Sequence, residues 1–148
     1  MKINLVIPGI PQPKQSARFR AVKNGNKSFV KSYQKKEVKE NERNIKYEIR
    51  SQLPVGFIPF QNGIKVNKLH YIFPPLKGFS KKKMQEIVDG AIIYKDTKPD
   101  LTDNLQKGLF DAMEGLVFLN DSQVCELNNV KKYYGFQPRI EIELEEVN

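Results

Sequence analysis

The segment KPDLTDNLQKGLFDAMEGLVFLNDSQV, residues 98–124, contains a helix pattern followed by a short apolar run. The pattern predicts a helix from about Asp103 to Glu114, whose apolar stripe at i, i+4 and i+8 is formed by Leu105, Leu109 and Met113. Gly115 suits the position just after the helix. Leu116–Leu119 is a short strand candidate, and Asn120-Asp121 turns the chain towards a longer strand.

Strand patterns flank this segment. Residues 139–147 alternate cleanly between apolar and acidic side chains, which predicts an antiparallel strand with one wet face. Ile64–Phe73 is a second strand, and its alternation slips between Val66 and Leu69 in the manner of a bulge. The other predicted strands are Ile3–Ile7 and Val124–Tyr134.

Two further helices are predicted, each with a serine at its start. Ser32 is the expected N-cap of a long helix that reaches about Leu53, and Ser80 that of a short helix through Val88. The resulting order is β-α-β-(short α)-α-β-β-β. We therefore expect an α+β (mixed α/β) fold, a single domain over residues 1–148 with a mixed β-sheet and two main helices.

Composition narrows the class of partner and of metal. The net charge of +8 and the pI near 9.5 favour a polyanion or an anionic surface. No apolar run approaches the roughly 20 residues of a membrane span, and no secretion signal precedes Pro11, so we expect a soluble cytoplasmic protein without a membrane partner. Because Cys125 and His70 are the only residues of their types, any metal would need oxygen ligands. We expect Cys125 and His70 to be packed residues with structural roles.

The strongest basic run lies between residues 14 and 36, which contain eight basic residues and no acidic one. Asn24-Gly25-Asn26 within it favours a hairpin or a mobile arm. A second cluster lies in the first turns of the short helix, where the helix dipole disfavours cations. A run of this kind is usually a solvated face, but the lack of acids favours nucleic-acid contact. The expected DNA-binding residues are Lys14, Arg18, Arg20, Lys23, Lys27, Lys81, Lys82 and Lys83.

Carboxylates gather around the predicted central helix. Asp100 and Asp103 stand at its start, and Asp121 follows the short strand candidate. Lys107 and Asp111 continue the helix face that Asp103 begins. Such oxygen ligands suit Mg²⁺ and leave coordination positions for a phosphate, while a lysine can stabilise developing negative charge.

Each of these residues also has a structural interpretation. Asp103 and Gln106 match a capping box, Lys107 and Asp111 match a surface i, i+4 pair, and Asp121 matches an aspartate that bonds its own turn. From the residues alone these alternatives stay open.

The order of these residues resembles the acidic core of the RusA-like Holliday junction resolvases. The matching residues are Lys98-Pro-Asp-Leu-Thr-Asp-Asn-Leu-Gln-Lys, then Phe110-Asp-Ala, then Asn120-Asp-Ser-Gln-Val124. The resemblance implies that Asp100, Asp103 and Asp121 are metal-binding carboxylates and that Lys107 is the catalytic lysine. It further implies a Mg²⁺- or Mn²⁺-dependent endonuclease that acts on four-way DNA junctions as a homodimer, without a small-molecule cofactor, and often encoded by a phage or prophage.

The sequence departs from the family pattern at one informative place. The family's usual aspartate pair is separated by one residue, whereas Leu101 and Thr102 both stand between Asp100 and Asp103. The extra residue must be absorbed as a bulge or an added half-turn. Two other functions remain compatible with the same residues: a non-catalytic DNA-binding module, and a nuclease on other branched or single-stranded DNA.

Overall fold

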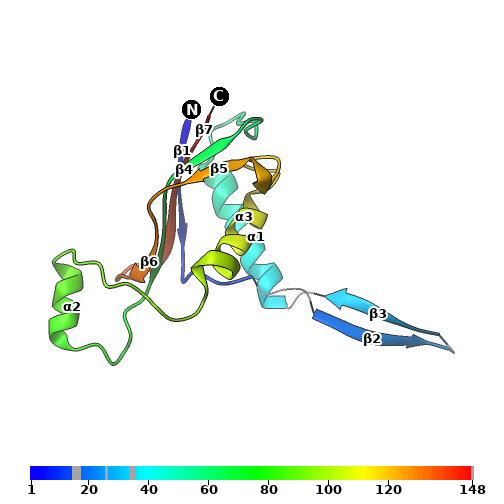
Figure 1. Cartoon of the computed structure of the whole chain (residues 1–148), viewed down its shortest axis with the longest axis horizontal. Coiled ribbons are helices and arrows are strands. Elements are labelled where there is room, and N and C mark those ends of the chain that lie inside the picture. The colour runs from blue at the N-terminus through cyan, green and yellow to red at the C-terminus, as the bar shows by residue number, and fades with distance from the viewer. Residues whose placement is uncertain (15–17, 26, 34–35, 148) are drawn as a thin grey trace.

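Alternating apolar residues build the centre of the main sheet. In the computed structural model, which describes residues 1–14, 18–25, 27–33 and 36–147, strand β7 (Arg139–Glu146) buries Ile140, Ile142 and Leu144. It pairs antiparallel with β1 (Lys2–Pro8) on one side and with β4 (Ile64–Phe73) on the other. Strands β5 (Val124–Leu127) and β6 (Val130–Tyr134) both run parallel to β4. The predicted α+β class with a mixed sheet is confirmed (Figure 1).

Strand β4 and its neighbours contain the irregularities of the sheet. The predicted slip is confirmed, because the register with β7 shifts between Val66 and Lys68. The prediction of one strand from Val124 to Tyr134 is wrong. Asn129 has a φ of 52°, which breaks the chain into β5 and β6, and the side chain of Asn128 donates to the carbonyl of Val66 at the break.

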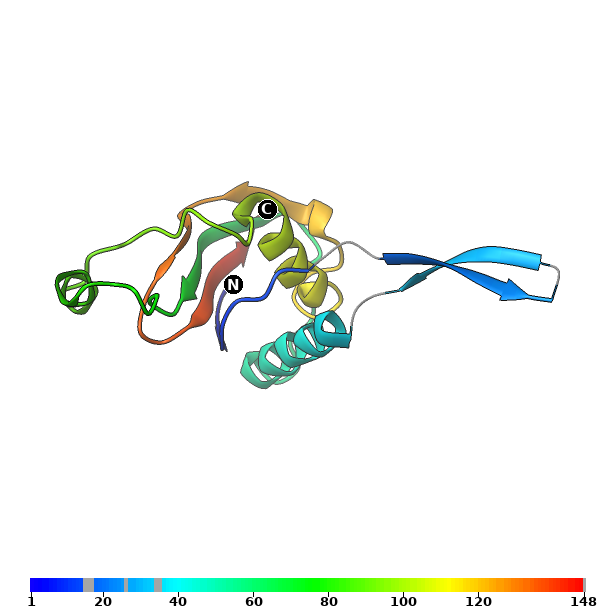
Figure 2. The ribbon, with the colours of Figure 1, turned by 90° about the horizontal axis from the view of Figure 1, so that it is seen from below.

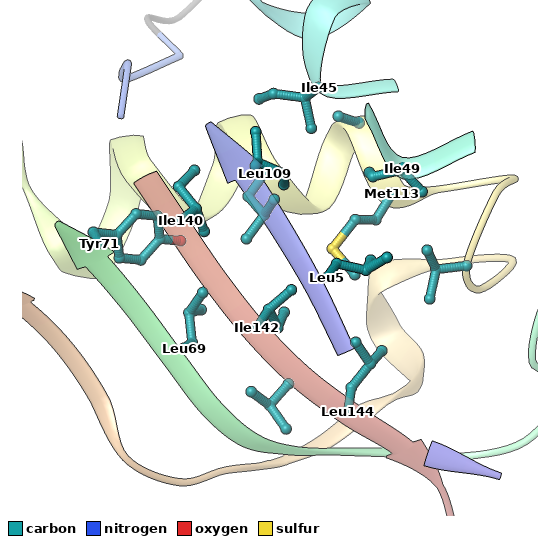
Figure 3. Close-up of a cluster of buried hydrophobic side chains, with 14 of the residues drawn as sticks. Leu5, Ile45, Ile49, Leu69, Tyr71, Leu109, Met113, Ile140, Ile142 and Leu144 are labelled. Carbon is teal, nitrogen blue, oxygen red and sulfur yellow. The ribbon is translucent and has the colours of Figure 1, made fainter. Parts of the chain in front are cut away.

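Helices α1 (Lys36–Gln52) and α3 (Gln106–Met113) cover one face of the sheet (Figure 2). Their buried residues meet those of β1, β4 and β7 in one hydrophobic core, which includes Ile45, Ile49, Leu109 and Met113 (Figure 3). The expected N-cap of α1 is wrong, because Ser32 belongs to a strand and the helix starts at Lys36. Leu116–Leu119 forms turns with single bridges at Phe118 rather than the expected strand.

The outer edge of β1 is closed by a helix side chain. Gln52, the last residue of α1, accepts a hydrogen bond from the amide of Val6 at 2.9 Å. Its own amide group donates to the carbonyl of Val6 at 2.6 Å. The glutamine thus satisfies two backbone groups that a neighbouring strand would otherwise take.

Two basic elements project from opposite ends of the molecule (Figure 1). Strands β2 (Arg18–Asn24) and β3 (Lys27–Tyr33) form an antiparallel ribbon around Gly25, whose φ is +65°, and this confirms the predicted hairpin. At the other end, α2 (Lys81–Val88) begins at Ser80, which accepts a bond from the amide of Lys83 as predicted. Across the described residues, no helix has the length and apolar character to cross a membrane.

Candidate active site

The start of the α3 region contains a turn wider than an α-helical one. Residues Leu101–Leu105 form the π-helix η1, in which the amide of Leu105 donates to the carbonyl of Asp100 at 3.1 Å. A π-turn takes up one more residue than an α-turn, and such turns are frequent at functional sites. The extra residue between Asp100 and Asp103 is therefore absorbed as a bulge within the helix, one of the two forms expected.

The side chains of Asp100, Asp103 and Lys107 are exposed at this end of the helix. The capping interpretation of Asp103 is wrong, since η1 starts after Asp100 and Asp103 lies inside the helical turn. Asp111 pairs with Lys14 at 2.9 Å, and the ion pairs found within the described part of the chain do not include Lys107. Two carboxylates and one ammonium group thus face solvent on neighbouring turns.

Neighbouring segments hold this region in place. The amide of Lys14 donates to the carbonyl of Asn104 at 3.0 Å, which attaches the segment after β1 to η1. Gly108 permits that approach, because a Cβ there would lie 3.3 Å from the Cβ of Lys14. A pocket of about 240 Å³ opens beside Asp100, and it is lined by Pro13, Lys98, Pro99, Asp100 and Asn104.

Asp121 lies at the other end of α3. Its amide donates to Oε1 of Glu114, the C-cap residue of that helix, at 3.0 Å. At a rise of about 1.5 Å per residue, Glu114 is roughly 16 Å from Asp103 along the helix. Among the described residues, which include all three aspartates, no three acidic, histidine or cysteine side chains form a group able to hold a metal ion. One chain therefore does not bring Asp121 to Asp100 and Asp103.

The turn at Asp121 is stabilised by its neighbours. Asn120 accepts from the amide of Ser122 at 2.9 Å, and Gln123 accepts from the amide of Asn120 at 2.8 Å, which completes a capping box. The capping pattern that the sequence offered at Asp103 is found here instead. The exposed carboxylate of Asp121 is left available for another contact.

The expected DNA-binding lysines differ in their surroundings. Lys23 and Lys27 are exposed near the tip of the ribbon, and Lys81 and Lys82 are exposed on α2. Lys14 is ion-paired with Asp111, and Lys83 lies over the ring of Phe79 at 4.4 Å. Arg18 and Arg20 belong to β2, but their side chains lie outside what the structure describes. DNA contact by all eight stays a prediction.

The lone histidine and cysteine have different environments. Nδ1 of His70 lies 3.0 Å from the hydroxyl of Tyr133, while its buried Nε2 has no partner within the described residues. Burial lowers the pKa of His70 below 6.5. The expectation of a packed Cys125 is wrong: it is exposed and its thiol donates to the carbonyl of Gln123. Its position at the sheet's outer strand explains this exposure.

Lys132 and Glu114 were missed as site residues by sequence reasoning. The ammonium of Lys132 donates to the carbonyls of Thr97 and Pro99, next to Asp100, and Glu114 binds the amide of Asp121. Adjacent lysines on a strand point to opposite faces, so the Lys131-Lys132 pair was a usable signal that one of them faces the helix side.

Comparison with known proteins shows the family to which the chain belongs. The family described as Endodeoxyribonuclease RusA matches residues 8–145, and the chain belongs to this family. It is also similar to the Uncharacterized protein YqaN of Bacillus subtilis (strain 168), with 39% identity over 69 residues. That similarity covers 47% of this chain and 47% of the relative, about half the length of each.

Proposed function

We propose that the protein is a divalent-metal-dependent endonuclease that resolves four-way DNA junctions. Membership of the RusA family supports the nuclease class. The observation that carries the proposal is the exposed group of Asp100, Asp103 and Lys107 on successive turns at the start of the α3 region. Its ligand oxygens are carboxylates, the donors that Mg²⁺ and Mn²⁺ take.

The chemistry divides between the metal and the chain's own residues. A bound divalent cation supplies Lewis-acid activation of water and charge neutralisation at the phosphate. Asp100 and Asp103 hold that cation, since their carboxylates are exposed and next to the same turn. Lys107, one turn further, supplies positive charge towards the phosphate oxygens as negative charge develops. The basic ribbon and α2 bind the DNA backbone and set its position.

A homodimer accounts for the two equivalent cleavage sites of the junction and for the position of Asp121 far from Asp103. Symmetric cutting of a junction needs two equivalent sites, which a two-fold dimer provides. Because Asp121 is at the opposite end of α3 from Asp103, we propose that it completes the site on the partner subunit. Mixing Asp103→Asn with Asp121→Asn chains then restores one intact site per mixed dimer and recovers nicking. Absence of recovery in proven mixed dimers rejects shared sites.

Cleavage of a synthetic four-way junction in Mg²⁺ is the primary test. Asp103→Asn and Lys107→Ala are each expected to lower kcat by about 10²-fold or more. Glu40→Gln, an exposed carboxylate on α1, is the matched control and keeps wild-type cleavage. If Asp103→Asn cuts as fast as wild type, the metal-site assignment is rejected, and Asp100→Asn tests the ligand beside the π-turn.

The substrate panel distinguishes the other functions. Flaps, replication forks and single strands are offered beside the junction under the same conditions. Preference for one of these shows a nuclease with another substrate. Tight binding without metal-dependent cutting shows a non-catalytic DNA-binding module on the same scaffold.

A further inference from the structure

Lys132 connects the central sheet to the segment that precedes Asp100. Its ammonium donates to the carbonyl of Thr97 at 2.5 Å and to that of Pro99 at 2.8 Å. Lys132 belongs to β6, which is paired with the buried strand β4. Bonds from a charged donor are stronger than neutral ones, so the segment is fixed to a rigid element.

One backbone hydrogen bond also attaches the same segment to β6, and one side-chain hydrogen bond stabilises the segment internally. The amide of Lys95 donates to the carbonyl of Lys132 at 3.1 Å, and the ammonium of Lys95 donates to Oγ1 of Thr97 at 3.0 Å. From the other side, the amide of Lys14 binds the carbonyl of Asn104. Asp100 therefore lies between two anchored points, Pro99 and Asn104.

Lys131 provides an internal comparison. Neighbouring residues of a strand point to opposite faces of the sheet. Lys131 is aligned with His70 of β4, on the face away from the helices, whereas the ammonium of Lys132 reaches Thr97 and Pro99. The two lysines have the same charge and adjacent positions, but only Lys132 bonds the segment before Asp100.

We propose that Lys132 is a positioning residue that holds Asp100 in place for the metal ion. This inference rests on the proposed function, in which Asp100 is a ligand. A carboxylate on a pre-ordered segment loses less conformational freedom when it binds a cation. Groups that orient metal ligands typically contribute about 10–100-fold to metal affinity or activity.

The first test measures the binding of Mn²⁺ alone by electron paramagnetic resonance titration. Lys132→Met is expected to weaken Mn²⁺ binding by about tenfold or more, while Lys131→Met stays within about twofold of wild type. Lys132→Arg, which keeps charged donors, restores most of the affinity. Amide hydrogen exchange is measured in parallel, and residues 97–105 are expected to exchange faster in Lys132→Met than in wild type and Lys131→Met.

Cleavage separates this inference from the proposed function. With Lys132→Met the Mg²⁺ concentration for half-maximal cutting rises, while kcat recovers at saturating Mg²⁺ and the KM for DNA is unchanged. If wild type cuts but Lys132→Met binds Mn²⁺ and exchanges as wild type does, the positioning role is overturned and the proposed function stands. If wild type neither binds Mn²⁺ nor cuts, both are overturned. Lys132→Gln replaces Lys132→Met under the same criteria if the methionine variant does not fold.

Discussion

The amide of Leu105 donates to the carbonyl of Asp100 at 3.1 Å, five residues back along the chain. The α-helical interval is four. This wide turn takes up the extra residue before the helix continues, so the stripe of Leu105, Leu109 and Met113 still faces the core. Asp100, Thr102 and Asp103 are exposed at this turn, whereas the apolar stripe that follows is buried.

Deletion of Thr102 tests this interpretation of the wide turn. Because Thr102 is exposed, its removal is expected to convert the turn to a regular one and to keep junction cleavage within about fivefold, or roughly 1 kcal/mol of barrier. Cleavage rates and circular dichroism melting curves check this. A well-folded deletion variant with cleavage lost would show that the wide turn itself is required.

The pair formed by Lys14 and Asp111 is expected to stabilise the attachment of the segment after β1 to α3. The two charges are 2.9 Å apart and their side chains are 17% and 27% exposed, so Lys14→Met should lower the free energy of unfolding by about 1–3 kcal/mol. Urea denaturation and a double-mutant cycle with Asp111→Asn measure the coupling. The comparison pair Lys36–Glu40, which is 85% and 52% exposed, should contribute under about 0.5 kcal/mol. Equal coupling in both pairs would contradict the argument.

DNA binding by the ribbon should be visible in its salt dependence. Lys23 and Lys27 are exposed near the tip, and replacing both with glutamine should reduce the slope of log K against log salt by roughly 2 if each contacts a phosphate. The control replaces Lys2 and Lys65 with glutamine. These lysines lie on the main sheet, and their replacement changes the net charge by the same amount. Fluorescence anisotropy on a junction at several salt concentrations gives both slopes. A slope that changes equally in the two variants would indicate overall charge rather than ribbon contact.

His70 should make stability depend on pH in a defined direction. Its folded-state pKa lies below the unfolded value of 6.5 because burial disfavours the imidazolium. The unfolded chain therefore binds more protons between the two pKa values, and the free energy of unfolding falls as pH drops below 6.5. His70→Phe should lose this part of the dependence.

Since His70 is the single histidine, its NMR resonance reports the folded-state pKa directly. Urea denaturation of wild type and His70→Phe between about pH 5 and 7.5 measures how the free energy of unfolding of each depends on pH. A folded-state pKa above 6.5 would reverse the sign and contradict the prediction.

Strong periodic patterns in the sequence predicted their elements well. β4 and β7 occur where expected, and the slip between Val66 and Leu69 is a real register shift. Short-range signals were less decisive. Ser32 looked like an N-cap, but it is paired in the ribbon, and Asn129, with a positive φ, interrupts the single strand predicted from Val124 to Tyr134.

The site was predictable as a set of residue types but not as a geometry. Asp100, Asp103 and Lys107 share one end of a helix because sequence neighbours on adjacent turns must do so. The position of Asp121 depends on the path of the chain after Gly115, which is set by tertiary packing. Asp121 lies beside Glu114 rather than beside Asp100 and Asp103. Lys132 was missed because its partners are backbone carbonyls, which no side-chain motif records.

The two hydrogen bonds between Gln52 and the backbone of Val6 limit how copies of this protein can associate. With the amide and carbonyl of Val6 already bonded, a second β1 cannot be added there to form a continuous intermolecular sheet. Fibril-like stacking through this edge is thereby obstructed. A two-fold assembly that used this edge of the sheet would have to join through side-chain surfaces instead of through strand pairing at Val6.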